Sequence, residues 1–235
     1  MDYLNYGKSR PQSLVENQTQ KLEDSPPPEK QSKVLLLFPT PVCITPPYPD
    51  DYSLQLEWIK SLELRGNGHE NCENNRTSVN TFVLDNPIMA EIRSFIEVEL
   101  NNFALNILGY DRKFVITQSW INRNSKREFH HLHAHPNSII SGVWYPQIGR
   151  ETPPISFSNL HDKGIVIPPV EYNSCNGETQ HVHANQGEMI MFPSYLKHSV
   201  PPNKSDEERI SLSFNTWIRG SLGSKEHLTY LPQDV

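Results

Sequence analysis

The spacing of apolar residues predicts helices in the first half of the chain. Over residues 88–107, apolar side chains recur every three or four positions. The flanking residues agree with a helix, since they provide capping side chains, a proline for the first helical position and a terminating glycine: Asp85, Asn86, Pro87 and Gly109. Residues 53–64 show the same spacing over a shorter length. We therefore expect one short and one long helix before residue 110.

From residue 113 onwards, apolar positions alternate in short runs separated by proline, glycine and asparagine, which is the period of strands. An earlier strand is expected in "KVLLLFPTPVCI", residues 33–44. Helices followed by strands predict a mainly β fold, an antiparallel barrel or sandwich with flanking helices against one side. The later predicted strands are 113–123, 138–146, 153–159, 165–172, 187–194 and 209–219.

The ends of the chain differ in character. Residues 1–32 are polar, have no sustained apolar period and end in a short run of prolines. We interpret them as a disordered polar tail. Residues 33–235 form a single predicted domain, long enough to bury a substantial core. Within it, residues 65–76, "RGNGHENCENNR", are expected to form a polar loop.

The composition excludes several classes of protein. The net charge of -6 provides no basic excess with which to bind nucleic acid. No apolar run approaches the length of a membrane span, and no secretory signal is expected. Three cysteines lie far apart, which suits free thiols in a reducing compartment: Cys43, Cys72 and Cys175. We expect a cytoplasmic protein with no membrane partner, and the sequence leaves an oligomer open.

Four histidines stand together ahead of a predicted strand: His130, His131, His133 and His135. On an extended strand, residues two apart share a face, so the last three of these are expected to point one way and His130 the other. A His-x-His pair on a strand can present two imidazoles to one metal ion. The alternative is a solvated run of histidines.

A second region offers a further ligand. In "GEMIMFPSYLKHSV", residues 187–200, a buried strand ends at a Pro193-Ser194 turn and His198 follows. Taken alone, this histidine would be a surface residue on a loop. Together with the earlier cluster it indicates a metal site, because such a site needs a ligand from a distant strand.

The strand at 209–219 has one polar face and one apolar face. Polar residues inside a barrel are costly to bury unless they bind something. The guanidinium of Arg209 can bind a carboxylate through two parallel hydrogen bonds, and Ser211 adds a hydroxyl beside it. The alternative is an exposed edge strand with an ordinary arginine. The polar face comprises Arg209, Ser211, Ser213 and Asn215, and the apolar face Ile210, Leu212 and Phe214.

These residues carry a family resemblance. The patterns H-x-H-P-N-S-x-x-S-G-V-x-Y from His133, F-P-S-x-x-x-H-x-V from Phe192 and R-x-S from Arg209 resemble the 2-oxoglutarate- and Fe(II)-dependent oxygenase superfamily. In particular they resemble small oxygenases of bacteria and phages that are related in pattern to the aspartyl/asparaginyl β-hydroxylases. The resemblance spans residues 34–219. It implies a double-stranded β-helix, a jelly-roll or cupin-like barrel with helices on one sheet.

The resemblance also implies roles for matching residues. His133 takes the place of the first metal ligand and His198 that of the distal ligand. Arg209, with Ser211 beside it, takes the place of the basic residue that holds the distal carboxylate of 2-oxoglutarate. His135 stands where the superfamily usually has an acid, which departs from the common set of two histidines and one carboxylate.

Strand geometry then limits which clustered histidines can share one metal. Successive residues on one face lie about 7 Å apart along a strand, so two of them can lean toward an ion but hardly three in a row. With the family pattern, this predicts ligation by His133, His135 and His198. His131 is expected not to bind the metal directly.

The implied activity is that of a non-haem dioxygenase and hydroxylase, with Fe(II) as cofactor and 2-oxoglutarate and O2 as co-substrates. It couples decarboxylation of 2-oxoglutarate to oxidation of a C–H bond, and the protein orients the reactants. The substrate is unknown and is either a small molecule or a protein side chain. Candidate supporting residues around the cofactors are Trp120, Asn122, Asn137, Ser141 and Tyr145.

The main alternative is a cupin-type metal-dependent enzyme or binding protein that does not use 2-oxoglutarate. Gly187, Pro193 and His198 match part of the second cupin pattern, but Ile139 and Ile140 stand where the first pattern needs glutamate. A metal-free binding module is a further alternative. The cupin alternative gives no role to Arg209 and Ser211.

The His181-Val-His183 pair has the same spacing as the predicted ligands. It lies in a polar stretch before a strand, so a solvated loop or hairpin is expected there.

Overall fold

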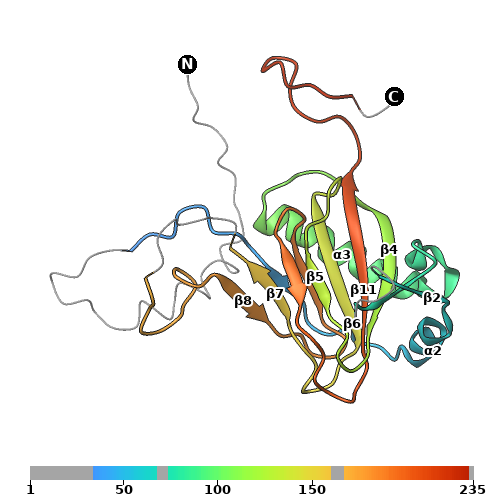
Figure 1. The fold of residues 1–235 in the computed structure, drawn as a ribbon. Coiled ribbons are helices and arrows are strands. Elements are labelled where there is room, and N and C mark those ends of the chain that lie inside the picture. Colours follow the sequence, from blue (N-terminus) through green and yellow to red (C-terminus); the bar gives the residue numbers. More distant parts are fainter. Residues whose placement is uncertain (1–33, 68–73, 160–166, 233–235) are drawn as a thin grey trace. The chain divides into compact units, whose positions relative to one another are not determined.

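The computed structural model describes residues 34–67, 74–159 and 167–232 (Figure 1). The chain divides into two units, Met1–Pro39 and Thr40–Val235. Only residues 34–39 of the first unit are described, so the predicted disordered tail at 1–32 lies outside the described residues. Every described helix and strand belongs to the second unit.

The larger sheet has seven antiparallel strands within the described residues, in the order β1-β9-β6-β11-β4-β3-β2. Its longest pairing joins β11 to β4, from Arg209 opposite Asn124 to Ile218 opposite Phe114. The strands are β1 Cys43–Ile44, β2 Leu64–Gly66, β3 Arg76–Ser78, β4 Phe114–Asn124, β6 Ile140–Gln147, β9 Met189–Pro193 and β11 Arg209–Ile218.

The smaller sheet has the order β5-β10-β7-β8 and is also antiparallel. Figure 1 shows β5 and β7 beside the long strands of the larger sheet. Two antiparallel sheets with few helices confirm the predicted fold class, a double-stranded β-helix. The four strands are β5 His130–His133, β7 Ile155–Ser158, β8 Thr179–Val182 and β10 His198–Val200.

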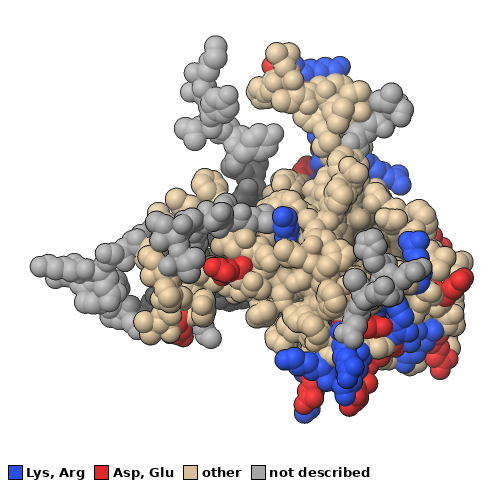
Figure 2. All heavy atoms as spheres, in the orientation of Figure 1, with Lys and Arg blue, Asp and Glu red and all other residues tan. Residues whose placement is uncertain are grey.

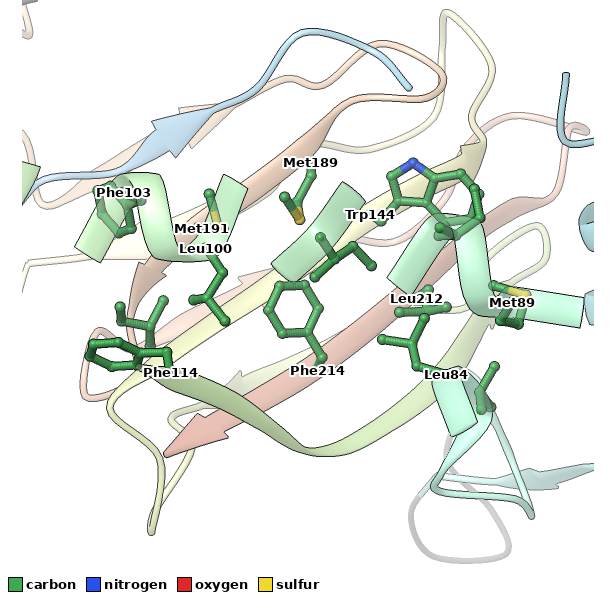
Figure 3. Packing of buried hydrophobic residues seen from close by; sticks show 14 of the residues in the cluster. Leu84, Met89, Leu100, Phe103, Phe114, Trp144, Met189, Met191, Leu212 and Phe214 are labelled. Carbon is green, nitrogen blue, oxygen red and sulfur yellow. The ribbon is translucent and has the colours of Figure 1, made fainter. Parts of the chain in front are cut away.

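The helical segments pack on one face of the larger sheet. In Figure 3, Leu100 and Phe103 lie over the sheet near Met191, and Phe214 lies between them and Leu212. Alternation along β11 then turns its polar residues toward the other face, where the smaller sheet lies. The segments are α2 Ser53–Ser61, the 3₁₀ turns η3 Val83–Asp85 and η4 Pro87–Met89, α3 Ala90–Asn102, and the π-helical η5 Phe103–Ile107.

A second, smaller core lies between the two sheets. Side chains from β6, β9 and β7 form it, and they fill the part of the barrel interior that the polar residues leave free. Its members are Val143, Tyr145, Ile155, Phe157, Ile190, Phe192 and Leu196.

The long helix begins and ends as its sequence predicts. The side chain of Asn86 accepts a hydrogen bond from the backbone N–H of Ile88 at 3.1 Å, and Pro87 follows as the first residue of η4. Gly109 has φ +71°, the left-handed conformation typical of a residue that follows a helix.

One predicted strand is much shorter than expected, and another is absent from its described residues. Of the strand predicted at 33–44, only Cys43–Ile44 (β1) is present among the described residues. Val34–Phe38 form no strand, and their side chains are 64–96% exposed. Residues 167–172 form none either, and residues 160–166 lie outside the described part. In both stretches, prolines follow or interrupt the apolar run and remove the donors that a sheet ladder needs. Strand β8, in contrast, was not predicted, because its sequence is polar.

Removal of residues 1–39 is expected to change the melting temperature by less than about 3 °C. For a domain of this size, a change of about 1 kcal/mol in unfolding free energy shifts the melting temperature by about 3 °C. The exposed side chains of residues 34–38 bury little apolar area, so their loss should change the unfolding free energy by less than that. Thermal unfolding followed by circular dichroism measures this. A chain starting at Pro46 is the control, since it also lacks β1 and its pairing with β9, and should melt clearly lower. An equally large drop for both truncations would contradict the prediction.

Candidate metal centre

Three histidines converge where the two sheets face each other. His133 ends β5, His135 follows two residues later, and His198 begins β10 directly opposite His133. One ring nitrogen of each lies within 4.8 Å of the others. The structure thus brings together the three histidines that the sequence singled out, and we call them the inner histidine set.

Hydrogen bonds orient all three rings in the same way. The Nδ1 atoms of His133 and His198 lie 2.8 and 3.0 Å from the backbone carbonyls of His131 and Leu196. A carbonyl oxygen only accepts, so Nδ1 carries the proton in each ring and Nε2 keeps a free lone pair. Metal-binding histidines commonly show this arrangement, because the second nitrogen fixes the ring.

His135 is held by a side chain instead. Its Nδ1 donates to Oδ1 of Asn215 at 2.6 Å, and Ser141 donates to the same oxygen at 2.9 Å. The ring stacks on Trp120 with 5.6 Å between centroids. Its Nε2 is buried without a hydrogen-bond partner among the described residues. A buried nitrogen lone pair without a partner is a position that a metal ion can fill.

Burial keeps these imidazoles neutral. Burial, together with neighbouring imidazoles, lowers the pKa of His133 to about 4 and that of His198 to about 3. Burial also lowers the pKa of His135, and the hydrogen bond to Asn215 opposes this. The neutral ring is the form that binds metals, so no proton has to leave at neutral pH.

The structure corrects the predicted orientation of the other clustered histidines. His133 is opposite His198 but His130 is opposite Val200, so β5 has one residue more than β10 over this stretch. Such a bulge shifts the alternation of side chains. The rings of His130 and His133 therefore stack with 4.3 Å between centroids, on the same side and not on opposite faces as predicted. The ring of His131 lies 5.2 Å from each of them and is exposed.

An open cavity of about 480 Å³ lies over the histidines. Its volume falls within the range of small-molecule sites. The wall is formed by hydroxyl, amide and imidazole groups with one arginine and one tryptophan. The lining residues are Arg65, Asn67, Thr77, Thr81, Gln118, Trp120, His130, His131, His133, Ala134, His135, Pro136 and Asn215.

Arg209 lies inside the barrel, and no acidic side chain among the described residues pairs with it. It is 2% exposed, its Nη1 donates to Oγ of Ser211 at 3.2 Å, and its guanidinium carbon lies 5.0 Å from the centre of the Tyr145 ring. Burial lowers its pKa, and Tyr145 opposes this. Burial and neighbouring imidazoles, with a smaller contribution from Arg209, also lower the pKa of His130 to about 2, so the arginine acts on the histidine cluster. Ion pairs of the described residues involve other basic side chains: Arg76, Arg93, Arg123 and Lys126.

Asn124 lies beside Arg209 and was not predicted as a site residue. The two are directly opposite on β4 and β11, so their side chains share a face. Asn124 is fully buried, and neither its Oδ1 nor its Nδ2 has a hydrogen-bond partner among the described residues; the same holds for Nε of Arg209. Strand alternation from Trp120 would have indicated that Asn124 points inward.

The remaining predicted residues have different positions. Asn122 bridges Asn75 and Ser213 through hydrogen bonds of 2.9 Å, so its amide is already used within the protein. Asn137 is an exposed turn residue with φ +57° and does not line the cavity. The structure therefore does not bring Asn137 into the site.

The His181-Val-His183 pair lies on and just after β8 at the sheet edge, as the hairpin alternative predicted. His181 binds Oγ of Ser156 at 2.7 Å through Nδ1. Neither histidine belongs to a potential metal-binding group among the described residues.

Comparison with known proteins gives one family match. Residues 118–215 match the family described as "Putative 2OG-Fe(II) oxygenase", a range that contains the inner histidine set and Arg209. Over this range the chain is similar to 2-oxoglutarate- and Fe(II)-dependent oxygenases. No curated protein matches the chain.

Solved structures share the fold of this chain at low sequence identity. A 2OG-Fe(II) oxygenase family oxidoreductase from Burkholderia pseudomallei is 16% identical with a TM-score of 0.52, over 74% of this chain and 83% of that one. The α-ketoglutarate-dependent epimerase SnoN of nogalamycin biosynthesis is 12% identical with a TM-score of 0.59, over 79% and 82%. A prolyl-4-hydroxylase from Pseudomonas putida is 13% identical with a TM-score of 0.54, over 77% and 94%.

Asn215 is expected to affect metal binding without contacting the metal. Asn215→Ala removes the acceptor that fixes the Nδ1 proton and the ring orientation of His135, so the affinity for Fe(II) should fall about 10- to 100-fold. Anaerobic competition with a chelator measures this affinity. Asn137→Gly is the matched control, because glycine suits φ +57° and the residue lies outside the cavity. Equal affinities in the two variants would show that Asn215 does not position His135.

Proposed function

We propose that the inner histidine set holds Fe(II) and that Arg209, with Ser211 and Asn124, holds the distal carboxylate of 2-oxoglutarate, in an enzyme that hydroxylates a C–H bond of its substrate. The observation that carries this proposal is the group of buried polar atoms without partners around Arg209. Burying a charge without a partner costs on the order of several kcal/mol. A bound anion would offset this cost.

The donor set supports the choice of ligands. Three neutral imidazoles present Nε2 toward one point, with their Nδ1 atoms occupied by carbonyl or amide oxygens. Imidazole nitrogen is a ligand of Fe(II) in proteins, and an open cavity beside the set leaves room for further ligands. The residues present therefore fit a mononuclear iron centre.

The residues around Arg209 would bind and orient the co-substrate. The guanidinium offers paired donors to a carboxylate, Ser211 and the Asn124 amide offer further donors, and Tyr145 packs beneath the guanidinium. When bound, Fe(II) and 2-oxoglutarate supply the O2-dependent oxidation. The protein's part is to hold both in place and to exclude water through the apolar core between the sheets.

The absence of an acid from the inner set supports a kinship with the aspartyl/asparaginyl β-hydroxylases. His135 occupies the position where an acid is usual, so the ligands leave one more positive charge on the centre. Anionic co-substrate would compensate this charge in part. We propose that His135 is a true ligand, fixed by Asn215 as described above.

The cavity supports a small molecule or a single protein side chain as substrate. Its wall offers amides and hydroxyls for hydrogen bonding, the cation of Arg65, and the face of Trp120. Nucleic acid is disfavoured by the net charge of -6. On the face in Figure 2, basic and acidic side chains are also intermixed and form no basic stripe.

A cytoplasmic location is part of the proposal. Among the described residues, no helix has the length and apolar character needed to cross a bilayer. Cys43 is a free thiol. A reducing compartment such as the cytoplasm suits such a thiol.

Anaerobic reconstitution tests the proposal. Fe(II) and 2-oxoglutarate added together should give a visible metal-to-ligand charge-transfer absorption, and admission of O2 should release succinate slowly without a primary substrate. Iron binding without the absorption would contradict the use of 2-oxoglutarate and favour a cupin-type enzyme.

Asn124→Asp is expected to make the protein more stable and, at the same time, unable to bind 2-oxoglutarate. The new carboxylate would lie beside Arg209 and satisfy the guanidinium, so the free protein should gain about 1 kcal/mol or more of unfolding free energy. The same carboxylate would repel 2-oxoglutarate and should abolish the charge-transfer absorption. Thermal unfolding and anaerobic titration measure the two effects. Asn124→Leu, which removes the amide without adding charge, should bind 2-oxoglutarate more weakly but still detectably. Unchanged 2-oxoglutarate affinity in Asn124→Asp would contradict the assigned position of the anion.

A further inference from the structure

A second group of three histidines lies at the mouth of the cavity. One ring nitrogen of each of His130, His131 and His133 lies within 4.8 Å of the others. We call these residues the outer histidine set. It shares His133 with the inner set, and its other two members have no part in the proposed iron site.

The bulge in β5 creates the outer set. By shifting the alternation between His130 and His133, it places both rings on one side of the strand. His131 then closes the group, with its ring 5.2 Å from each of the others. All three residues line the cavity, and His131 is exposed, so ions in solution can reach the group.

We propose that the outer histidine set binds Zn²⁺ or a similar divalent transition-metal ion, and that this binding excludes iron from the inner set. The inference rests on the proposed function, which assigns the inner set to Fe(II). Three imidazoles and one water form a common tetrahedral zinc site. Nitrogen ligands bind Zn²⁺ and Ni²⁺ more tightly than Fe(II), so the outer set favours the competing ion.

The exclusion follows from the hydrogen bonds of His133. Its Nδ1 donates to the carbonyl of His131, which leaves Nε2 as the single nitrogen available to a metal. One Nε2 cannot serve two ions. A zinc ion held by the outer set therefore takes a ligand from the iron centre.

Asn67 orients the remaining member of the outer set. Its Nδ2 donates to Nε2 of His130 at 3.1 Å, and the same amide group binds Oδ1 of Asn75 at 3.1 Å. Because neutral His130 accepts at Nε2, it carries its proton on Nδ1, so a bound ion replaces Asn67 as the partner of Nε2. The ring stays near its present position, because it stacks on His133.

Zinc stoichiometry in variants that lack the inner set tests the site directly. His135→Ala/His198→Ala retains His133 and the full outer set, and equilibrium dialysis should find one zinc ion per chain. Adding His131→Ala should weaken zinc binding at least about tenfold. Adding His183→Ala instead, the exposed histidine of the other closely spaced pair, should leave it unchanged. Equal zinc binding in the His131→Ala and His183→Ala backgrounds would overturn the proposal.

The intact protein provides a second measurement, which also covers the case in which the double variant does not fold. Zn²⁺ is titrated into the anaerobic complex with Fe(II) and 2-oxoglutarate, and loss of the charge-transfer absorption is followed. His131→Ala should need at least about tenfold more zinc than the wild type for half-loss. If this variant lost half of the absorption at the same zinc concentration as the wild type, the proposed outer site would be wrong and zinc would replace iron directly. Failure of the absorption to form without zinc contradicts the proposed function instead, and zinc stoichiometry still tests the outer site.

Discussion

Replacing Arg209 with alanine is expected to leave iron binding largely intact and to weaken 2-oxoglutarate binding about 30-fold to several thousand-fold. Removing one partner of a desolvated, charge-assisted pair costs on the order of 2–5 kcal/mol, and each 1.4 kcal/mol is about a factor of ten in affinity. Arg209 is 2% exposed and has no acidic partner among the described residues, so nothing else in the site can replace its charge. Anaerobic calorimetric titration with 2-oxoglutarate measures the loss.

Two further variants make this result specific. Arg219→Ala removes an exposed arginine just after the same strand and should bind 2-oxoglutarate as the wild type does. Arg209→Lys keeps the charge but lacks the planar fork, so its affinity should lie between those of the wild type and Arg209→Ala. Wild-type affinity in Arg209→Ala would remove the main argument against a cupin-type enzyme.

Loss of any member of the inner histidine set is expected to reduce iron affinity by orders of magnitude. Each ring contributes one Nε2 to a set of three, and each is already oriented by a hydrogen bond at Nδ1. A neighbouring residue that only supports a ligand changes affinity by about 10- to 100-fold. Chelator competition on His133→Ala, His135→Ala and His198→Ala distinguishes these two ranges.

His135→Asp provides the matched test of the unusual position. Aspartate would restore the common set of two histidines and one carboxylate, so the variant should retain iron where His135→Ala loses it. Loss of iron from both variants would show that the site tolerates only imidazole there, because Asn215 and Ser141 are arranged to hold a ring.

Periodicity predicted β4 and β11 because these two strands are long and two-faced. Strand β11 is the clearest case, since Leu212 and Phe214 pack in the helix-side core while Arg209 and Ser211 face the smaller sheet. Burial of one face against helices leaves a strong alternating signal. The inward position of Arg209 could therefore be predicted from the sequence.

Features that depend on tertiary context could not be predicted in this way. The bulge in β5 depends on its pairing with β10, so the orientation of His130 was wrong. Asn124 stands out as a site residue only from its place opposite Arg209, where its amide has no hydrogen-bond partner among the described residues. The apolar run Val34–Phe38 has a strand-like composition but pairs with no strand among the described residues.

The most direct test of the central claim is the iron content of four single alanine variants, at His131, His133, His135 and His198, after anaerobic loading with one equivalent of Fe(II). The account predicts that His133→Ala, His135→Ala and His198→Ala lose the metal during desalting, whereas His131→Ala retains it. The contradictory result is loss of iron from His131→Ala together with retention by His135→Ala. It would place the iron in the outer histidine set.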